Sequence, residues 1–118
     1  MKTRLVVRAI IQRGDDVLVN VTKNGPRLLG GSVKKDERLT EALARELAEE
    51  CGLRVTVRDA VLVQERIKKS YRELTVVFRV HVFGDLDNIK GREKGIKPRW
   101  VPRGQVVGWN RPLQFDAI

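Results

Sequence analysis

The sequence lacks most of the features by which several protein classes are recognised. Its 118 residues include one cysteine, which excludes an intramolecular disulfide and a zinc site of several cysteines, and fits the reducing cytosol. No apolar run is long enough to span a bilayer, and the run Leu5–Val7 ends at Arg8, too early for a signal peptide. There is also no repeat, low-complexity tract or linker. We therefore expect one cytoplasmic domain over residues 1–118 without a membrane partner.

Basic residues are in clear excess. The chain has 24 Lys and Arg against 15 Asp and Glu, which gives a formal net charge of +9 at pH 7. Such a charge favours an anionic partner: nucleic acid, a polyphosphate, a nucleotide or an acidic membrane surface. The alternative is that the charge only keeps the protein soluble. Hydrophobic residues make up 42% of the chain, which is enough to fill a core and argues against disorder.

The hydrophobic pattern changes its period along the chain. Runs of alternating and β-branched residues predict strands, and an apolar stripe from Leu39 to Cys51 predicts a helix that ends at Gly52. The expected elements are a hairpin over residues 3–22, a short extended piece over 27–29, the helix over 39–51, strands within 53–67 with a break at 59–60, a strand over 74–83, a long exposed loop over 84–99 and a turn or short helix over 103–108. A mixed sandwich with one central helix is the simplest architecture.

The polar face of the expected helix is acidic. Glu46, Glu49 and Glu50 follow the spacing i, i+3, i+4, so their carboxylates share one side and repel one another. A divalent cation would relieve this repulsion, and Mg²⁺ prefers carboxylate oxygen. The alternative interpretation is an ordinary solvated acidic face.

The surrounding residues complete a longer pattern. With U a bulky aliphatic residue, the pattern G-x5-E-x7-R-E-U-x-E-E-x-G-U is matched at every specified position by Gly31, Glu37, Arg45, Glu46, Leu47, Glu49, Glu50, Gly52 and Leu53. This stretch resembles the signature of the Nudix hydrolase family, and a chance match at one start point is on the order of 10⁻¹⁰. Arg38 stands where the family often has Ser or Thr, so Asp36 or Thr40 is expected to cap the helix instead.

The resemblance implies both a fold and an activity. The implied fold is α+β, a Nudix-type α/β/α sandwich with a mixed β-sheet. Because the chain stops at Ile118, its C-terminal helix is expected to be short or missing, or that layer to be completed by a second copy in a homodimer. The implied activity is hydrolysis of a nucleoside diphosphate linked to another moiety, with Mg²⁺ or Mn²⁺ as cofactor.

The resemblance also implies which residues are catalytic and which bind the metal. The catalytic set is Glu46, Glu49 and Glu50. Glu49 and Glu50 would bind the metal directly, and Glu46 would be a further ligand or the group that orients or deprotonates the attacking water. Gly30 would offer its backbone carbonyl to the metal. A further carboxylate from outside the motif is expected at Glu93 or Glu65, and Glu93 is equally well read as an ordinary loop charge.

Four motif residues have structural roles by the same resemblance. Glu37 and Arg45 would form an ion pair that holds the loop against the helix, Gly31 belongs to the pair that lets the backbone approach the metal, and Gly52 would end the helix. Arg45 directly precedes Glu46, so its side chain is expected to leave the helix about 100° away from the acidic face.

Residues outside the motif bear on the substrate. Tyr71 stands at the position, 18 residues after Leu53, at which dinucleoside polyphosphate hydrolases of the family tend to carry a tyrosine. Its alternative role is packing. The residues expected to bind substrate are Tyr71, Lys34, Lys69 and Arg72. They favour a phosphate-rich nucleotide, either a nucleoside triphosphate or a dinucleoside polyphosphate. The alternatives are an RNA 5′-end pyrophosphohydrolase and a non-catalytic Nudix-fold module that binds RNA or nucleotide.

Overall fold

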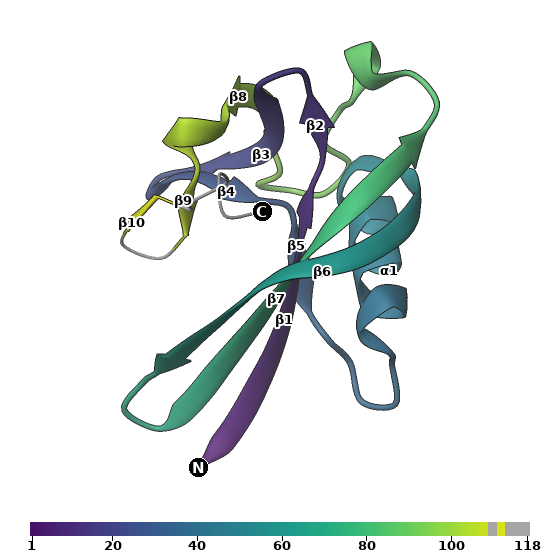
Figure 1. The fold of residues 1–118 in the computed structure, drawn as a ribbon. Helices are drawn as coiled ribbons and strands as arrows, with labels where there is room; N and C mark the ends of the chain where they lie inside the picture. The colour runs from purple at the N-terminus through teal and green to yellow at the C-terminus, as the bar shows by residue number, and fades with distance from the viewer. Residues whose placement is uncertain (109–110, 113–118) are drawn as a thin grey trace.

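The computed structural model describes residues 1–108 and 111–112. The elements in chain order are β1 (Lys2–Ile10), β2 (Gln12–Arg13), β3 (Asp16–Thr22), β4 (Gly25–Leu28), β5 (Gly30–Ser32), α1 (Leu39–Cys51), β6 (Arg54–Ile67), β7 (Tyr71–Phe83), the 3-10 turn η1 (Leu86–Asn88), β8 (Pro98–Pro102), the 3-10 turn η2 (Arg103–Gln105), β9 (Val107–Gly108) and β10 (Arg111–Pro112) (Figure 1). None of the helices in this described part is long and apolar enough to cross a bilayer.

The larger sheet is mixed, as the sequence predicts. Its strand order is β5-β1-β7-β6, with β1 parallel to β7 and the other pairs antiparallel. The break expected at residues 59–60 does not divide a strand in two. Instead, the pairing of β6 with β7 shifts register between Val57 and Leu62 and continues beyond, so β6 is one strand with an irregularity at that point.

The second sheet is built on β3, which pairs antiparallel with β2, β4 and β8. The expected hairpin over residues 3–22 is wrong for most of its length, because β1 pairs with β5 and β7 and only β2 pairs with β3. The physical reason lies in residues 6–11. Neighbouring residues such as Val6 and Val7 are both buried, so this strand needs cover on both faces and takes a central place in the larger sheet. The loop expected over 84–99 likewise ends earlier, at β8.

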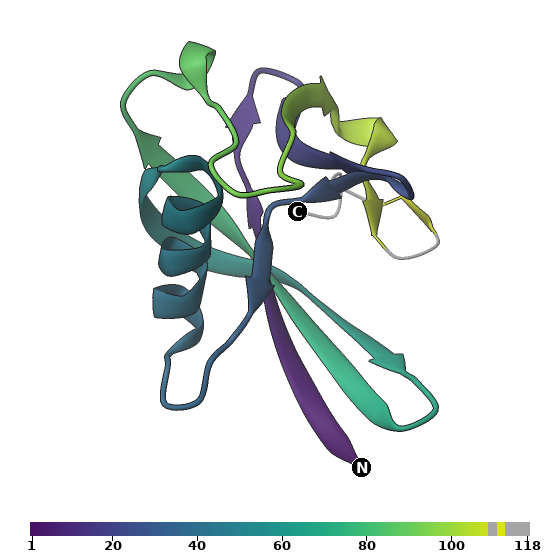
Figure 2. The same cartoon turned by 180° about the vertical axis from the view of Figure 1, so that it is seen from behind.

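Helix α1 covers one face of the larger sheet (Figure 2). Ala42, Leu43 and Leu47 are fully buried against side chains of β1, including Val7 and Ala9. A second core cluster lies on the opposite side and joins the two sheets through Ile10, Val17, Val19, Leu28, Val77 and Val106. The expected α+β fold with a mixed sheet is confirmed. Within residues 1–108 and 111–112, α1 is the only α-helix.

The helix spans the predicted residues but begins at a different cap. Its C-terminal Gly52 adopts the left-handed φ of 66° and donates its N–H to the Ala48 carbonyl. The expected N-caps Asp36 and Thr40 are wrong, since Arg38 occupies the N-cap. The Arg38 backbone N–H donates to the Glu41 carboxylate at 2.9 Å. The Arg38 guanidinium carries only donors, so it cannot accept the Glu41 backbone N–H in return. Only half of a capping box is therefore present.

Arg38→Ser should stabilise the protein, because a serine hydroxyl can accept the Glu41 N–H and complete the capping box. We expect the free energy of unfolding, measured with urea, to rise by about 1 kcal/mol relative to Arg38→Ala, which removes the same charge without adding an acceptor. Equal stability of these two variants would contradict the assignment of the cap.

Candidate functional site

Three carboxylates from two segments meet beside α1. Glu46 and Glu49 come from successive turns of the helix, and Glu93 comes from the loop between η1 and β8. One oxygen of each lies within 4.8 Å of the others. Of the two candidates outside the motif, Glu93 therefore joins the acidic face. Glu65 does not join this cluster and lies 3.4 Å from Arg72 near the β6–β7 turn.

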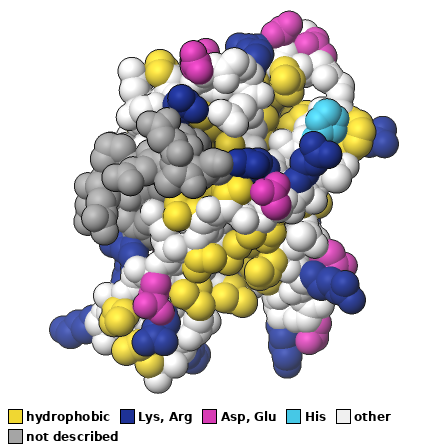
Figure 3. Space-filling view, in the orientation of Figure 1, with side chains coloured by type: hydrophobic (Ala, Val, Ile, Leu, Met, Phe, Trp, Pro, Cys, Tyr) yellow, Lys and Arg dark blue, Asp and Glu magenta, His cyan; other side chains and the backbone are white. Residues whose placement is uncertain are grey.

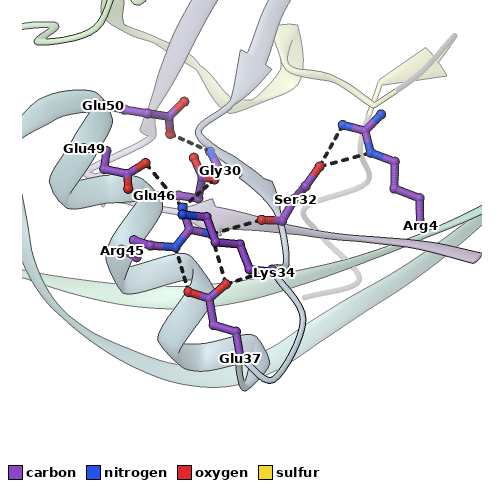
Figure 4. A network of polar contacts seen from close by, with 9 residues as sticks. All are labelled: Arg4, Gly30, Ser32, Lys34, Glu37, Arg45, Glu46, Glu49 and Glu50. Atoms are coloured by element: carbon purple, nitrogen blue, oxygen red, sulfur yellow. Dashed lines mark hydrogen bonds and ion pairs between the residues drawn. The ribbon is translucent and has the colours of Figure 1, made fainter.

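Glu50 is held apart from this cluster. Its side chain turns toward β5, where it accepts a hydrogen bond from the Gly30 N–H at 3.0 Å (Figure 4). Only 7% of the residue is exposed, so it is not part of a solvated acidic face. Burial, together with the nearby Glu46 carboxylate, raises the pKa of Glu50 to about 7. The expected role of the Gly30 carbonyl toward a metal stays a prediction, while its N–H orients Glu50.

Arg45 connects the loop before the helix to the acidic cluster. Its Nε donates to Glu37 at 2.6 Å and its Nη2 donates to the same carboxylate at 3.0 Å, a two-point contact. Nη2 also donates to the Ser32 carbonyl, and Nη1 donates to Glu46 at 3.0 Å and to Glu49 at 3.3 Å (Figure 4). The expected ion pair with Glu37 is present, so the guanidinium does face the loop, but the expectation that it leaves the acidic face free is wrong, because Nη1 reaches both glutamates.

Glu37 is the other end of this connection. Besides Arg45, it accepts the Lys34 N–H at 2.9 Å, which closes the loop on itself. These donors, the Arg45 guanidinium first, lower the pKa of Glu37 to about 2. The carboxylate is therefore ionised in the folded protein at any ordinary pH.

Gly31 lies where β5 passes the acidic face of α1, and the position of Glu46 requires a glycine there. A Cβ at Gly31 would lie 2.5 Å from the Glu46 carboxylate carbon, so any side chain there would displace Glu46. The close approach of β5 to the helix thus explains the motif glycine in physical terms.

The residues expected to bind substrate are only partly brought together. Tyr71 and Lys34 line a hollow of about 1150 Å³, whereas Lys69 and Arg72 are not among its lining residues. The lining residues are Met1, Lys2, Thr3, Arg4, Leu5, Val33, Lys34, Lys35, Asp36, Glu37, Ser70 and Tyr71. In the space-filling view, hydrophobic side chains gather between the projecting ends of β1, β6 and β7 and the lower end of α1, with charged side chains at the rim (Figure 3).

A polar path joins this hollow to the acidic cluster. Arg4 in the hollow donates to the Ser32 hydroxyl at 2.9 Å, and the Ser32 carbonyl accepts from Arg45, which contacts Glu46 and Glu49 (Figure 4). Neither Arg4 nor Ser32 stood out in the sequence, because Arg4 lies outside the motif and Ser32 occupies one of its unspecified positions.

Arg8 was also missed. It lies in β1 within an apolar run, and its Nη1 donates to the Leu28 carbonyl at 3.3 Å. Burial lowers the pKa of the Arg8 guanidinium, and the negative charge of Glu50 opposes that shift. The signal in the sequence is a single cation inside the run Leu5–Ile10.

Comparison with known proteins agrees with this geometry. The family model described as NUDIX domain matches residues 2–117. The E. coli ORF135 protein superposes with a TM-score of 0.72 at 27% identity, covering 85% of this chain and 74% of that one. A MutT protein from Methanosarcina mazei Go1 superposes with a TM-score of 0.70 at 25% identity, covering 85% of this chain and 77% of that one. A MutT NUDIX hydrolase from Burkholderia pseudomallei superposes with a TM-score of 0.72 at 20% identity, covering 99% of this chain and 94% of that one. This last comparison shows a likeness of fold. The curated proteins contain no match to the chain.

The Glu37–Arg45 pair predicts a pH dependence of stability. Because folding lowers the pKa of Glu37 from 4.5 to about 2, its contribution is fully present above pH 4.5 and is lost as the pH falls toward 2. We expect the free energy of unfolding to fall more steeply over this window in the wild type than in Glu37→Gln. Urea titrations at several pH values measure both slopes, and parallel slopes would refute the assignment.

Proposed function

Because the chain belongs to the NUDIX domain family, we propose that it is a Mg²⁺- or Mn²⁺-dependent pyrophosphohydrolase that cleaves a diphosphate linkage in a nucleoside diphosphate-X substrate. Membership of the family makes it a hydrolase acting on phosphorus-containing anhydrides. The observation that carries the proposal is that Glu46 and Glu49, which belong to a complete family motif, meet the Glu93 carboxylate from outside the motif within 4.8 Å. We favour a nucleoside triphosphate or a dinucleoside polyphosphate as the substrate.

The acidic cluster fits a hard divalent cation. Its donors are all carboxylate oxygens, the ligands that Mg²⁺ and Mn²⁺ prefer, and they converge from two elements as a metal site requires. Glu46, Glu49 and Glu93 would hold the ion, with Glu50 and the Gly30 carbonyl as the remaining predicted ligands. When bound, the metal neutralises charge on the diphosphate and lowers the pKa of water.

Phosphoryl transfer depends mainly on positioning and on neutralisation of charge, and the residues of this chain contribute the positioning of the metal ligands. Arg45 holds one oxygen each of Glu46 and Glu49, and is itself held by Glu37. The carboxylates are thus oriented by a shell of hydrogen bonds, and such outer partners commonly tune metal affinity.

The hollow supports a place for the part of the substrate beyond the diphosphate. Tyr71 offers a ring for stacking on a base, and Lys34 lies with Lys2, Lys35 and Arg4 among the lining residues. We propose that Lys69 and Arg72, in and beside the β6–β7 turn, act at longer range on the same phosphates.

The basic surface favours one second candidate, hydrolysis at an RNA 5′ end. A net charge of +9 attracts a polyanion larger than a free nucleotide. A non-catalytic binding module is less consistent with three converging carboxylates, because without a metal they would repel both one another and a nucleic acid.

Glu49→Gln should abolish most of the activity without unfolding the protein, because it removes one carboxylate charge from the cluster at a side chain that is 46% exposed. We expect the rate of nucleotide hydrolysis with Mg²⁺ to fall by about 10²-fold or more. The assay uses nucleoside triphosphates, dinucleoside tetraphosphates and 5′-triphosphate RNA, with both products identified. Asp59→Asn removes a carboxylate charge outside the cluster, at a residue that pairs with Arg79, and as the control it should keep the wild-type rate. An unchanged rate in Glu49→Gln would refute the site.

Tyr71→Ala should raise KM for a dinucleoside polyphosphate by about 10-fold with little change in kcat, since stacking on one base is worth about 1–3 kcal/mol. Tyr71→Phe keeps the ring and should behave like the wild type. Steady-state kinetics distinguish the two roles, because a tyrosine that only packs would change stability and leave KM unaltered.

A further inference from the structure

Glu93, the acidic residue outside the motif, lies in residues 89–97, a segment that we call the strap and that is anchored to the rest of the protein. Ile89 and Ile96, near its two ends, pack against the core cluster beneath α1. At its C-terminal end the Lys97 N–H donates to the Asn20 side-chain oxygen at 2.7 Å, which ties the strap to β3. The strap is therefore held at both ends by the body of the protein.

The middle of the strap is fastened to the C-terminal end of α1. The Arg92 N–H donates to the Glu50 carbonyl at 2.7 Å, and so satisfies one of the carbonyls that a helix end leaves without a partner. No basic residue occupies the last turn of the helix itself. The strap supplies one instead, because the Arg92 guanidinium lies directly against Gly52, where a Cβ would collide with it. A cation at this end is favoured by the helix dipole.

The contacts of Arg92 with the end of α1 determine where Glu93 lies. Glu93 follows Arg92 in the chain, and its carboxylate is the third member of the cluster with Glu46 and Glu49. Its carbonyl accepts the Ile96 N–H at 3.1 Å, which turns the strap back toward the core. Glu93 is thus placed by the backbone on either side of it.

We propose that Arg92 is a positioning residue: its guanidinium, packed on Gly52, clamps the strap to the end of α1 and so delivers Glu93 to the acidic cluster. The inference rests on the proposed function, since it assigns the cluster to a divalent cation. The competing explanation is that Arg92 is only a surface cation near the site.

Lys94 provides a matched control for this proposal. It lies on the same strap, one residue beyond Glu93, and is exposed. Its side chain makes no hydrogen bond or ion pair with the residues that the structure describes. Arg92→Ala and Lys94→Ala therefore remove the same charge at the same distance in sequence from Glu93, and only the first removes the clamp.

The two explanations predict opposite signs for metal binding. Loss of a nearby cation, acting through charge alone, makes the site more negative and tightens Mn²⁺ binding. Loss of the clamp frees Glu93 and weakens it. In the absence of substrate, with free Mn²⁺ measured by electron paramagnetic resonance, we expect Arg92→Ala to weaken binding by about 10-fold. Lys94→Ala should leave it unchanged or slightly tighter, and Arg92→Lys should restore part of the affinity.

A double mutant tests whether Arg92 acts through Glu93. Glu93→Gln should weaken Mn²⁺ binding. Adding Arg92→Ala to it should lower the Mn²⁺ affinity little further, because the residue that Arg92 positions no longer carries a carboxylate. Full additivity of the two losses would overturn the proposal. So would Mn²⁺ affinity in Arg92→Ala that equals or exceeds that of the wild type.

Hydrogen exchange in the metal-free protein separates this inference from the proposed function. Protection of the residue 92 amide should fall by about 10-fold or more in Arg92→Ala and not in Lys94→Ala. If the wild type binds no Mn²⁺ and hydrolyses no nucleotide, the proposed function fails. If it does both while protection is unchanged in Arg92→Ala, only the clamp is overturned.

Discussion

The Arg45 guanidinium donates to the Glu37 carboxylate, to the Ser32 carbonyl and to the Glu46 and Glu49 carboxylates. It therefore ties the end of β5, the loop before the helix and the acidic face of α1 into one unit. The side chain is 21% exposed, and its contact with Glu37 has two points, which makes it stronger than an ordinary surface pair. The same cation offsets the repulsion between glutamates one turn apart.

The fold supplies the rigid support on which this unit rests. Leu43 and Leu47 anchor α1 on the larger sheet, and the opposite face of that sheet is covered by the second sheet through Val17, Val19 and Val77. Because the second half of β1, from Val6 on, is buried on both faces, β5 has a fixed partner there and passes close to the helix. The Gly30 N–H reaches Glu50 from β5, whereas Glu46 projects from the helix, so packing far from the chemistry determines the geometry of the acidic face.

Local patterns in the sequence were sufficient to predict several of the helices and strands. The apolar stripe from Leu39 to Cys51 predicted the helix with its observed bounds, and the alternation in residues 74–83 predicted most of β7. The errors occurred where pairing partners are distant. The hairpin over 3–22 was wrong because local turn residues do not reveal that β1 is buried on both faces. The expected caps Asp36 and Thr40 were wrong because Glu37 is held by Arg45 and Lys34, which leaves Arg38 at the N-cap and Leu39 as the first helical residue.

The sequence by itself determined the acidic helix face and the motif around it, because positions three and four apart share one side of a helix whatever surrounds it. Only the tertiary structure decided that Glu93 and not Glu65 completes the cluster, that Glu50 is buried against the Gly30 N–H, and that Arg45 reaches the acidic face. The physical reason is range. Helix periodicity is encoded in neighbouring residues, whereas the meeting of the strap with the end of α1 depends on core packing and on hydrogen bonds between segments that are distant in the chain.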